Sequence, residues 1–172
     1  MSFPNSDLGT WIRRLRDPDA EASLKDRLDE IDRDALDSAV GFAAEHTRRY
    51  IATDGKDDGW DGPRPILILY TVGRRSGQLR RNPLLFFEHD GVRHVIGSNG
   101  GAAEHPLWYG NLLAEPRVHV RVGAEVLAVT ARTRDRAERA ELWPHLIASY
   151  PMFGDYQAAT DRPIPVVGLD PD

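Results

Sequence analysis

The sequence predicts an α+β protein that is mainly β: a small antiparallel barrel preceded by a helical extension. From residue 65 onward, short apolar runs are bounded by glycine and proline, a pattern typical of buried strands. Turns such as His89-Asp90-Gly91 join neighbouring runs as hairpins. Before residue 62, apolar residues recur at helical spacing instead. Antiparallel strands with few inserted helices favour a barrel, because a barrel closes its own sheet edges.

The first part of the chain is expected to contain three helices. Residues 7–16 form a short one, and Asp17-Pro18 supplies an N-cap and a first helical residue for the second. Residues 35–52 form the third. Residues 53–63 are rich in glycine and aspartate and are expected to form a loop.

This loop divides the chain into an extension, residues 1–62, and a main domain, residues 63–172. The extension carries 15 acidic and 9 basic residues, and the main domain 12 and 13, so an anionic ligand is expected on the main domain. We interpret the extension as a packing or homodimer-forming arm, because its acidic polar face suits neither a membrane surface nor nucleic acid. Deleting residues 1–50 is then expected to leave the barrel folded.

The main domain is expected to alternate strands with a few helices. A D-x-x-E capping box, Asp135 with Glu138, begins the longest of these helices. The expected strands cover residues 65–72, 82–88, 92–96, 118–122, 125–134 and 164–167, and another helix runs from Pro106 to about Ala114.

Composition excludes several classes of protein and site. No apolar run is long enough for a transmembrane helix, and the N-terminus lacks the order of a signal peptide, so a cytoplasmic protein is expected. Cysteine is absent, which excludes disulfides and thiolate chemistry. The six histidines form no metal-binding pattern, and neither G-x-S-x-G nor a strand-following G-x-G-x-x-G occurs, so no metal site, hydrolase or Rossmann fold is expected.

The main candidate site is the arginine-rich turn between residues 71 and 83. Its two glycines, Gly73 and Gly77, permit a backbone that aims N–H groups at an anion. Its arginines carry guanidinium groups that match phosphate or carboxylate geometry. The turn is interpreted as a phosphate-binding hairpin, with a basic surface turn as the alternative. The arginines are Arg74, Arg75, Arg80 and Arg81.

Two of these arginines are expected to converge on one anion. Arg75 and Arg80 lie on the two sides of the hairpin. Arg81 follows Arg80 on a strand, so its side chain is expected on the opposite face, and its removal is expected to cost little ligand affinity.

A second glycine-rich turn, residues 97–101, leads towards the helix expected at Pro106. Free backbone donors and the helix dipole favour an anion or a carbonyl-rich ring there. Ser98, Asn99 and Gly100 are the candidate residues.

On that helix, Trp108 and Asn111 are three residues apart and share a face. A flat apolar wall and a two-sided amide could together hold a planar heterocycle. The alternative is a core tryptophan with an asparagine that caps a neighbouring strand.

Three aromatic residues near the C-terminus, Tyr150, Phe153 and Tyr156, recur at helical spacing. They are expected to line one wall of a site, where a hydroxyl positions or protonates a substrate. The alternative is an aromatic stripe that belongs to the core.

In this order, the motifs resemble the deazaflavin-dependent nitroreductase family, also called the F-420-dependent quinone reductase family. The resemblance covers about residues 63–170 and lies in the ordered combination of motifs. It is carried by Thr71-Val-Gly-Arg-Arg-Ser-Gly-Gln-Leu-Arg80, Gly97-Ser-Asn-Gly-Gly101, His105-Pro-Leu-Trp-Tyr-Gly-Asn-Leu112, Ala148-Ser-Tyr-Pro-Met-Phe-Gly-Asp-Tyr156 and Thr160-Asp-Arg-Pro-Ile-Pro-Val166.

The resemblance implies a split β-barrel, related to FMN-binding barrels, with coenzyme F-420 in its groove. Arg75 and Arg80 would hold the cofactor phosphate with Arg74 nearby, and Pro83 would pack beside the deazaflavin. The pocket would be completed by Ser98, Asn99, Gly100, Trp108 and Asn111. Asn99 stands where family members often have lysine, which removes one cation.

The resemblance also implies a substrate wall at Tyr150, Phe153 and Tyr156. Phe153 lacks a hydroxyl that the family's tyrosine-rich wall would have there. Phe153→Tyr is therefore expected to change the acceptor profile more than cofactor affinity.

The function that the resemblance implies is hydride transfer from reduced F-420 to a small electrophile, such as a quinone, an enone or a nitroaromatic. Tyr150, Tyr156 or solvent would supply the proton. An FMN- or haem-binding barrel and a non-catalytic F-420-binding protein are the alternatives.

Overall fold

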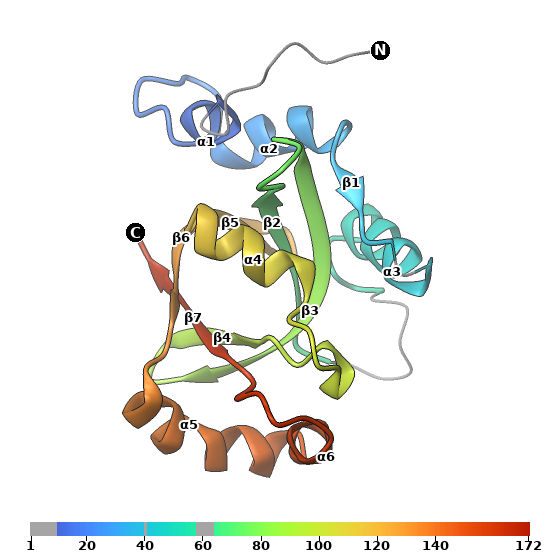
Figure 1. Ribbon diagram of the computed structural model, residues 1–172. Helices are drawn as coiled ribbons and strands as arrows, with labels where there is room; N and C mark the ends of the chain where they lie inside the picture. The colour runs from blue at the N-terminus through green and yellow to red at the C-terminus, as the bar shows by residue number, and fades with distance from the viewer. Residues whose placement is uncertain (1–9, 40, 58–63) are drawn as a thin grey trace.

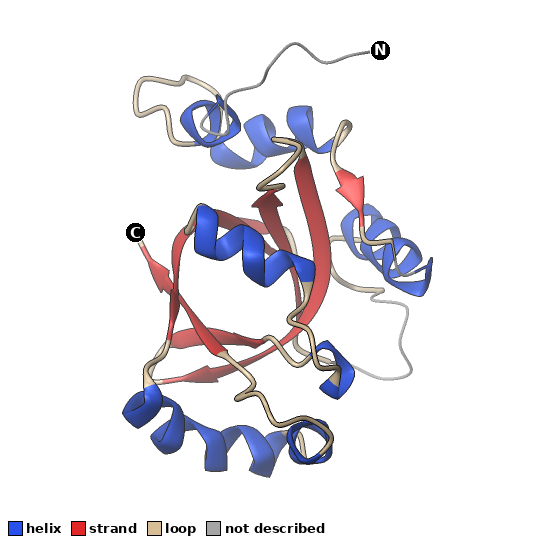
Figure 2. Ribbon diagram, viewed as in Figure 1, coloured by secondary structure: helices blue, strands red, loops and turns tan. Residues whose placement is uncertain are grey.

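The fold is a closed β-barrel with helices packed around it (Figure 1, Figure 2). The computed structural model describes residues 10–39, 41–57 and 64–172. Its elements are α1 (Thr10–Leu15), α2 (Leu24–Asp32), β1 (Leu36–Asp37), α3 (Gly41–Ala52), β2 (Ile66–Val72), β3 (Leu79–His89), β4 (Val92–Ile96), η1 (Asn99–Gly101), α4 (Leu107–Ala114), β5 (Arg117–Val122), β6 (Glu125–Thr133), α5 (Arg136–Ser149), α6 (Met152–Ala158) and β7 (Val166–Pro171). Among these residues, no helix has the length and apolar character needed to cross a membrane.

Six strands close the barrel in the order β3-β2-β5-β6-β7-β4, and a β4–β3 pairing completes the ring. Every pair in the ring is antiparallel. The predicted mainly β barrel with N-terminal helices is therefore confirmed. The last strand begins two residues later than predicted, at Val166, and continues to Pro171. Residues 7–9 and 58–63, parts of a predicted helix and loop, lie outside the described residues.

The start of the second helix was predicted wrongly. Helix α2 begins after Ser23, whose hydroxyl accepts the backbone N–H of Asp26 at 3.1 Å. Asp17 is not an N-cap: its carboxylate accepts the N–H of Asp19 at 3.0 Å in a turn. Both residues have side chains that suit an N-cap, and the polar turn after Asp17 delays the helix to Ser23.

Two residues of the predicted third helix form a strand instead. Leu36 and Asp37 pair in parallel with Arg80 and Arg81 of β3, and α3 begins only at Gly41. This pairing covers an edge of β3 that would otherwise be open. The strand β3 itself begins three residues earlier than predicted, so Arg80 and Arg81 lie on a strand.

Strand β2 is buried along its whole length because both of its faces are covered. Leu67 and Leu69 join the core inside the barrel, to which α4 also contributes. Ile66, Ile68 and Tyr70 join a second cluster with residues of α1, α2 and α3. A strand covered on both faces has a continuous apolar sequence, which explains why β2 shows no alternation.

Charged pairs reinforce the contact between the extension and the barrel. Arg121 on β5 has a side chain only 1% exposed and forms an ion pair with Asp29 of α2 at 2.6 Å. Arg81 on β3 donates to Asp32 at 3.0 Å and to Asp37. The acidic character of the extension thus has a structural role, because its carboxylates neutralise barrel arginines.

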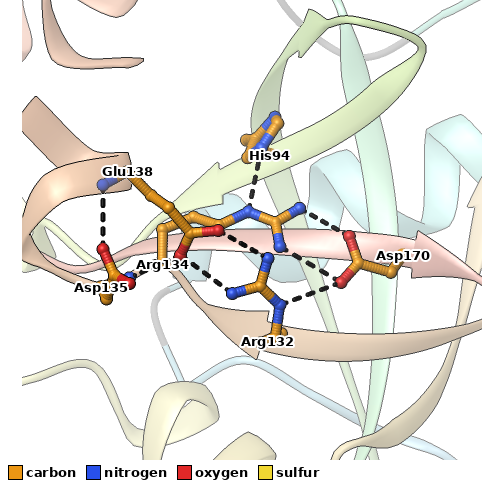
Figure 3. A network of polar contacts seen from close by, with 6 residues as sticks. All are labelled: His94, Arg132, Arg134, Asp135, Glu138 and Asp170. Atoms are coloured by element: carbon orange, nitrogen blue, oxygen red, sulfur yellow. Dashed lines mark hydrogen bonds and ion pairs between the residues drawn. The ribbon is translucent and has the colours of Figure 1, made fainter. Parts of the chain in front are cut away.

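A polar network joins β4, β7 and α5 on another side of the barrel (Figure 3). Arg134 donates to both carboxylate oxygens of Asp170 and, at 3.3 Å, to His94 Nε2. The predicted capping box is confirmed, since Asp135 N–H donates to Glu138 at 2.8 Å and Glu138 N–H donates to Asp135 at 2.9 Å. The network fixes where α5 starts relative to the barrel.

Buried His119 on β5 is expected to make the fold sensitive to acid. The pKa of His119 is lowered to about 4, mainly because the ring is buried. The charges of Arg16 and Arg27 lower this pKa further, and the carboxylate of Asp172 opposes them. An unfolded histidine has a pKa of about 6.5, so between about pH 6.5 and 4 the unfolded chain binds more protons. The contribution is fully present above this window and is lost as the pH falls through it.

We expect this loss to reach about 3 kcal/mol of the free energy of unfolding across the window. Urea denaturation at a series of pH values measures it. His119→Gln should flatten the pH dependence in the same window, and an unchanged dependence in this variant would assign the acid sensitivity to other groups.

Candidate functional site

One groove brings together every residue that was predicted to contact a cofactor. It has a volume of about 760 Å³. It is lined by residues of the β2–β3 turn, β3, the segment 96–106, the start of α4, and residues 36–39, 42 and 43. The predicted residues that line it are Arg74, Arg75, Arg80, Pro83, Ser98, Asn99, Gly100, Trp108 and Asn111.

A tight turn places Arg75 at this groove. The N–H of Gly73 donates to the carbonyl of Gln78, and the N–H of Gly77 donates to the carbonyl of Gly73, both at 2.8 Å. Gly77 has a φ of +68°, and a Cβ on Gly73 would lie 2.6 Å from Ser76 Oγ. Position 77 therefore favours glycine through its backbone conformation, and a side chain on Gly73 would displace Ser76.

Arg75 and Arg80 are the groove arginines whose side chains have no partner in the described part of the chain. Within residues 10–39, 41–57 and 64–172, neither makes an ion pair or a side-chain hydrogen bond. Arg75 is exposed, whereas Arg80 is half-buried on β3. Two unpaired guanidinium groups on one groove provide charge-assisted donors for an anion, which fits a phosphate-bearing ligand.

The side chains of Arg74 and Asn111 make hydrogen bonds to other protein groups. Asn111 Oδ1 accepts the backbone N–H of Arg74 at 3.1 Å, and its Nδ2 donates to Thr71 Oγ1 at 3.2 Å. Arg74 Nη1 donates to the carbonyl of Leu107 at 3.2 Å and packs on Gly110, where a Cβ would come within 2.5 Å of it. The geometry matches the alternative interpretation, in which Asn111 caps a neighbouring strand.

The second glycine-rich turn also faces the groove. Asn99, Gly100 and Gly101 have φ values of +48°, +62° and +82°, a backbone that asparagine and glycine adopt more readily than other residues. Asn99 Nδ2 donates to the carbonyl of Glu104 at 3.0 Å. A Cβ on Gly101 would lie 2.8 Å from the carbonyl oxygen of Tyr156, so α6 packs directly behind this turn.

Arg162 holds this turn in place, a role that the sequence did not reveal. Its guanidinium donates to the carbonyls of Gly97 at 3.1 Å, Ser98 at 2.7 Å and Ala102 at 2.9 Å, and to His105 Nδ1 at 3.2 Å. Because arginine only donates, the histidine proton lies on Nε2. Burial and the charge of Arg162 also lower the pKa of His105, which lines the groove as a neutral donor.

Pro83 and Trp108 both contribute apolar surface to the groove. Trp108 is only 6% exposed and belongs to the barrel core with Tyr109 and Leu112. Trp108 therefore belongs to the core and also lines the groove. Its packing in the core holds the ring rigidly beside the groove.

The predicted aromatic wall lies outside the groove. Tyr150, Phe153 and Tyr156 pack edge-to-face, with ring centroids 6.3 and 5.9 Å apart, in a cluster with α5. Tyr150 donates to the carbonyl of Phe86 at 3.4 Å, and burial raises its pKa. Phe153 is 5% exposed, so Phe153→Tyr would bury a hydroxyl and is now expected to affect stability before acceptor choice.

The sequence also missed one whole wall of the groove. Residues 36–39 together with Phe42 and Ala43 line it from the extension. Their place depends on the pairing of β1 with β3, which joins residues more than 40 positions apart. No local sequence pattern predicts such a contact. The role of Arg162 could have been suspected, because this residue lies within the motif at residues 160–166. In the described part of the chain, no three His, Cys, Asp or Glu residues are grouped to hold a metal ion.

Comparisons with known proteins agree with this geometry. A family model described as F420H(2)-dependent quinone reductase matches residues 43–171. A relative from Mycobacterium tuberculosis (strain ATCC 25618 / H37Rv), provisionally named such a reductase, is 37% identical over 113 residues, which cover 66% of this chain and 95% of the relative. Another protein of that strain, named F420H(2)-dependent quinone reductase, is 33% identical over 128 residues. The match covers 72% of this chain and 86% of that protein.

Two solved structures resemble the fold at higher coverage of their own chains. One is described as an F420-H2 dependent reductase and matches with a TM-score of 0.57 at 38% identity, over 65% of this chain and all of that one. The other, described as a domain-swapped dimer, has a TM-score of 0.59 at 36% identity, over 77% of this chain and all of that one. The chain therefore belongs to the F420H(2)-dependent quinone reductase family and is a split-barrel oxidoreductase that depends on coenzyme F-420.

Proposed function

We propose that the groove binds reduced F-420 through Arg75 and Arg80 and that the acceptor of its hydride is a quinone, an enone or a nitroaromatic. Bound F-420 supplies the hydride, and the protein supplies binding and orientation. The observation that carries this proposal is the pair of arginines, which have no partner within the described ranges and lie on a groove with a rigid apolar side.

The lining residues divide into those that would touch the cofactor and those that position them. Arg75 and Arg80 would hold the phosphate, and Pro83 and Trp108 would offer flat apolar contact to the ring. The backbone and side chains at Ser98, Asn99 and Gly100 would offer polar contacts. Because Arg162 already holds this turn, little ordering remains when the ligand binds.

Arg74 and Asn111 would act from behind the site. Their mutual hydrogen bond joins the arginine turn to α4, so it sets the distance between Arg75 and Trp108. We propose that both are positioning residues rather than direct cofactor contacts.

The proton that follows the hydride would come from water. Tyr150 and Tyr156, the predicted proton donors, do not line the groove. Solvent reaches the groove, because several of its lining residues are exposed, among them Arg75 and Asn99. No side chain is then needed as the acid.

A ligand titration followed by a turnover assay tests this function. Trp108 lines the groove, so its fluorescence should change when a ligand binds. We expect F-420 to bind at least about tenfold more tightly than FMN and haem, and reduced F-420 to be oxidised when a quinone is added. Tighter binding of FMN or haem would contradict the proposal, and F-420 binding without turnover would indicate a non-catalytic binder.

We propose that the protein is a cytoplasmic homodimer that acts on small molecules and not on nucleic acid, with residues 1–62 as an extension of the barrel domain, residues 63–172. The description of one similar structure as a domain-swapped dimer supports the dimer. The nearly even charge balance of the barrel domain, 12 acidic and 13 basic residues, does not favour binding to nucleic acid. Light scattering at several protein concentrations measures the oligomeric state.

A further inference from the structure

Exposed apolar side chains gather at the groove. Four large apolar residues are exposed in the described part of the chain: Leu36, Phe42, Leu107 and Leu113. All but Leu113 line the groove, and Phe42 and Leu107 are 63% and 76% exposed. Exposed apolar groups concentrated at one concave site, and not scattered over the surface, indicate a ligand-binding surface.

This apolar group adjoins the arginine pair. Leu36 is the sheet partner of Arg80, so the two residues lie side by side at the same register of β1 and β3. Leu107 comes directly before Trp108 at the start of α4. Phe42 lies in the first turn of α3, which follows β1. The apolar side chains therefore flank the part of the groove that the cofactor would occupy.

Ion pairs hold this wall in position. Asp37 of β1 accepts from Arg81 of β3 and, at 3.2 Å, from Arg48 of α3. These contacts fix both β1 and α3 relative to the barrel. The ring of Phe42 packs edge-on against His46 at a centroid distance of 5.7 Å, which orders the exposed aromatic group.

We infer that Phe42, with Leu36 and Leu107, forms the subsite for the hydride acceptor and selects flat quinone-like acceptors that carry apolar substituents. This inference rests on the proposed function. Hydride transfer requires the acceptor to lie against the cofactor in the same groove. The aromatic residues predicted to contact it, Tyr150 and Tyr156, are outside that groove, whereas Phe42 is inside it.

The expected consequence is selective. A phenyl ring that packs on an acceptor contributes to its binding free energy. Truncation of Phe42 should therefore raise KM for an alkyl-substituted quinone about tenfold. An unsubstituted quinone makes less apolar contact and should lose less. The affinity for F-420 should stay within about twofold, because Phe42 adjoins and does not form the phosphate site.

Phe42→Ala and Leu113→Ala are matched variants for the test. Both remove a large side chain that is 63% exposed, but only the first lies in the groove. The full chain is assayed with reduced F-420 and a series of quinones of increasing alkyl length, and F-420 binding is titrated in parallel. Phe42→Ala should lose the dependence on alkyl length, Leu113→Ala should keep it, and Phe42→Tyr should restore most of it.

The outcomes separate this inference from the proposed function. If the wild type neither binds nor oxidises reduced F-420, both fall. If the wild type is active and Phe42→Ala keeps the wild-type preference across the series, or loses F-420 affinity instead, the acceptor subsite alone is overturned. Equal thermal unfolding midpoints of the two alanine variants show that both remain folded.

Discussion

Replacing Arg80 with alanine is expected to weaken F-420 binding about tenfold to a hundredfold. A charge-assisted hydrogen bond to a phosphate contributes roughly 1.5–3 kcal/mol. Arg80 is half-buried and has no partner in the described chain, so its removal frees no other buried charge. Arg75→Ala should lose a similar amount, and lysine at either position should restore part of the affinity, because it keeps the charge without the planar fork.

The matched control for these variants is Arg136→Ala on α5. Arg136 is exposed, as Arg75 is, and like both groove arginines it is unpaired within the described ranges, but it does not line the groove. Fluorescence titrations at two salt concentrations are the measurement. Salt should weaken wild-type binding more than binding to Arg80→Ala, since the variant has one charge contact fewer to screen. Equal losses for Arg80→Ala and Arg136→Ala would reduce the site to non-specific basic attraction.

Replacing Arg81 with alanine is expected to destabilise the fold by about 3 kcal/mol. The side chains of Arg81, Asp32 and Asp37 are only 13%, 10% and 19% exposed. Removing one partner of a mostly buried ion pair leaves the opposite charge without compensation. Desolvation by itself would lower the pKa of Arg81, but the two carboxylates outweigh it and raise that pKa, which is consistent with a strong pair.

Urea denaturation of Arg81→Ala and of Arg81→Ala/Asp32→Asn tests this origin of the loss. The second variant removes the carboxylate of Asp32, which Arg81→Ala leaves without an ion-pair partner in the described chain, so it should be more stable than the first. If it is less stable, the loss comes from packing of the arginine side chain and not from charge. The sequence placed Arg81 on the face opposite to Arg80, and it does lie outside the groove. It is nevertheless a poor affinity control, because its loss loosens the wall that β1 forms.

Contacts between the extension and the barrel change what is expected of a chain that lacks residues 1–50. The extension covers Ile66, Ile68 and Tyr70 of β2 and neutralises Arg121, which is buried on β5. Deleting residues 1–50 would expose this apolar face and leave the arginine unpaired. We therefore no longer expect the barrel to fold normally without the extension.

Local chemistry explains which features the sequence could predict. Apolar runs, glycine turns and the Asp135–Glu138 capping box depend on residues that are close in the chain, so their patterns located six barrel strands and the start of α5. The turn glycines were also identifiable, because Gly77 adopts a positive φ and a Cβ on Gly73 would collide with Ser76 Oγ. Ordered motifs then located the arginine pair and the second turn on one groove.

The sequence by itself determined the barrel, the family and the motif residues that the main domain brings to the groove, because short-range backbone preferences and spaced motifs record these features. Only the tertiary structure decided which contacts each residue makes there. It assigned Asn111 and Arg74 to each other, moved Tyr150 and Tyr156 into a separate core, and brought Phe42 to the groove. These outcomes depend on contacts between distant segments, such as β1 with β3, whose free energy comes from burial and ion pairing that no local pattern encodes.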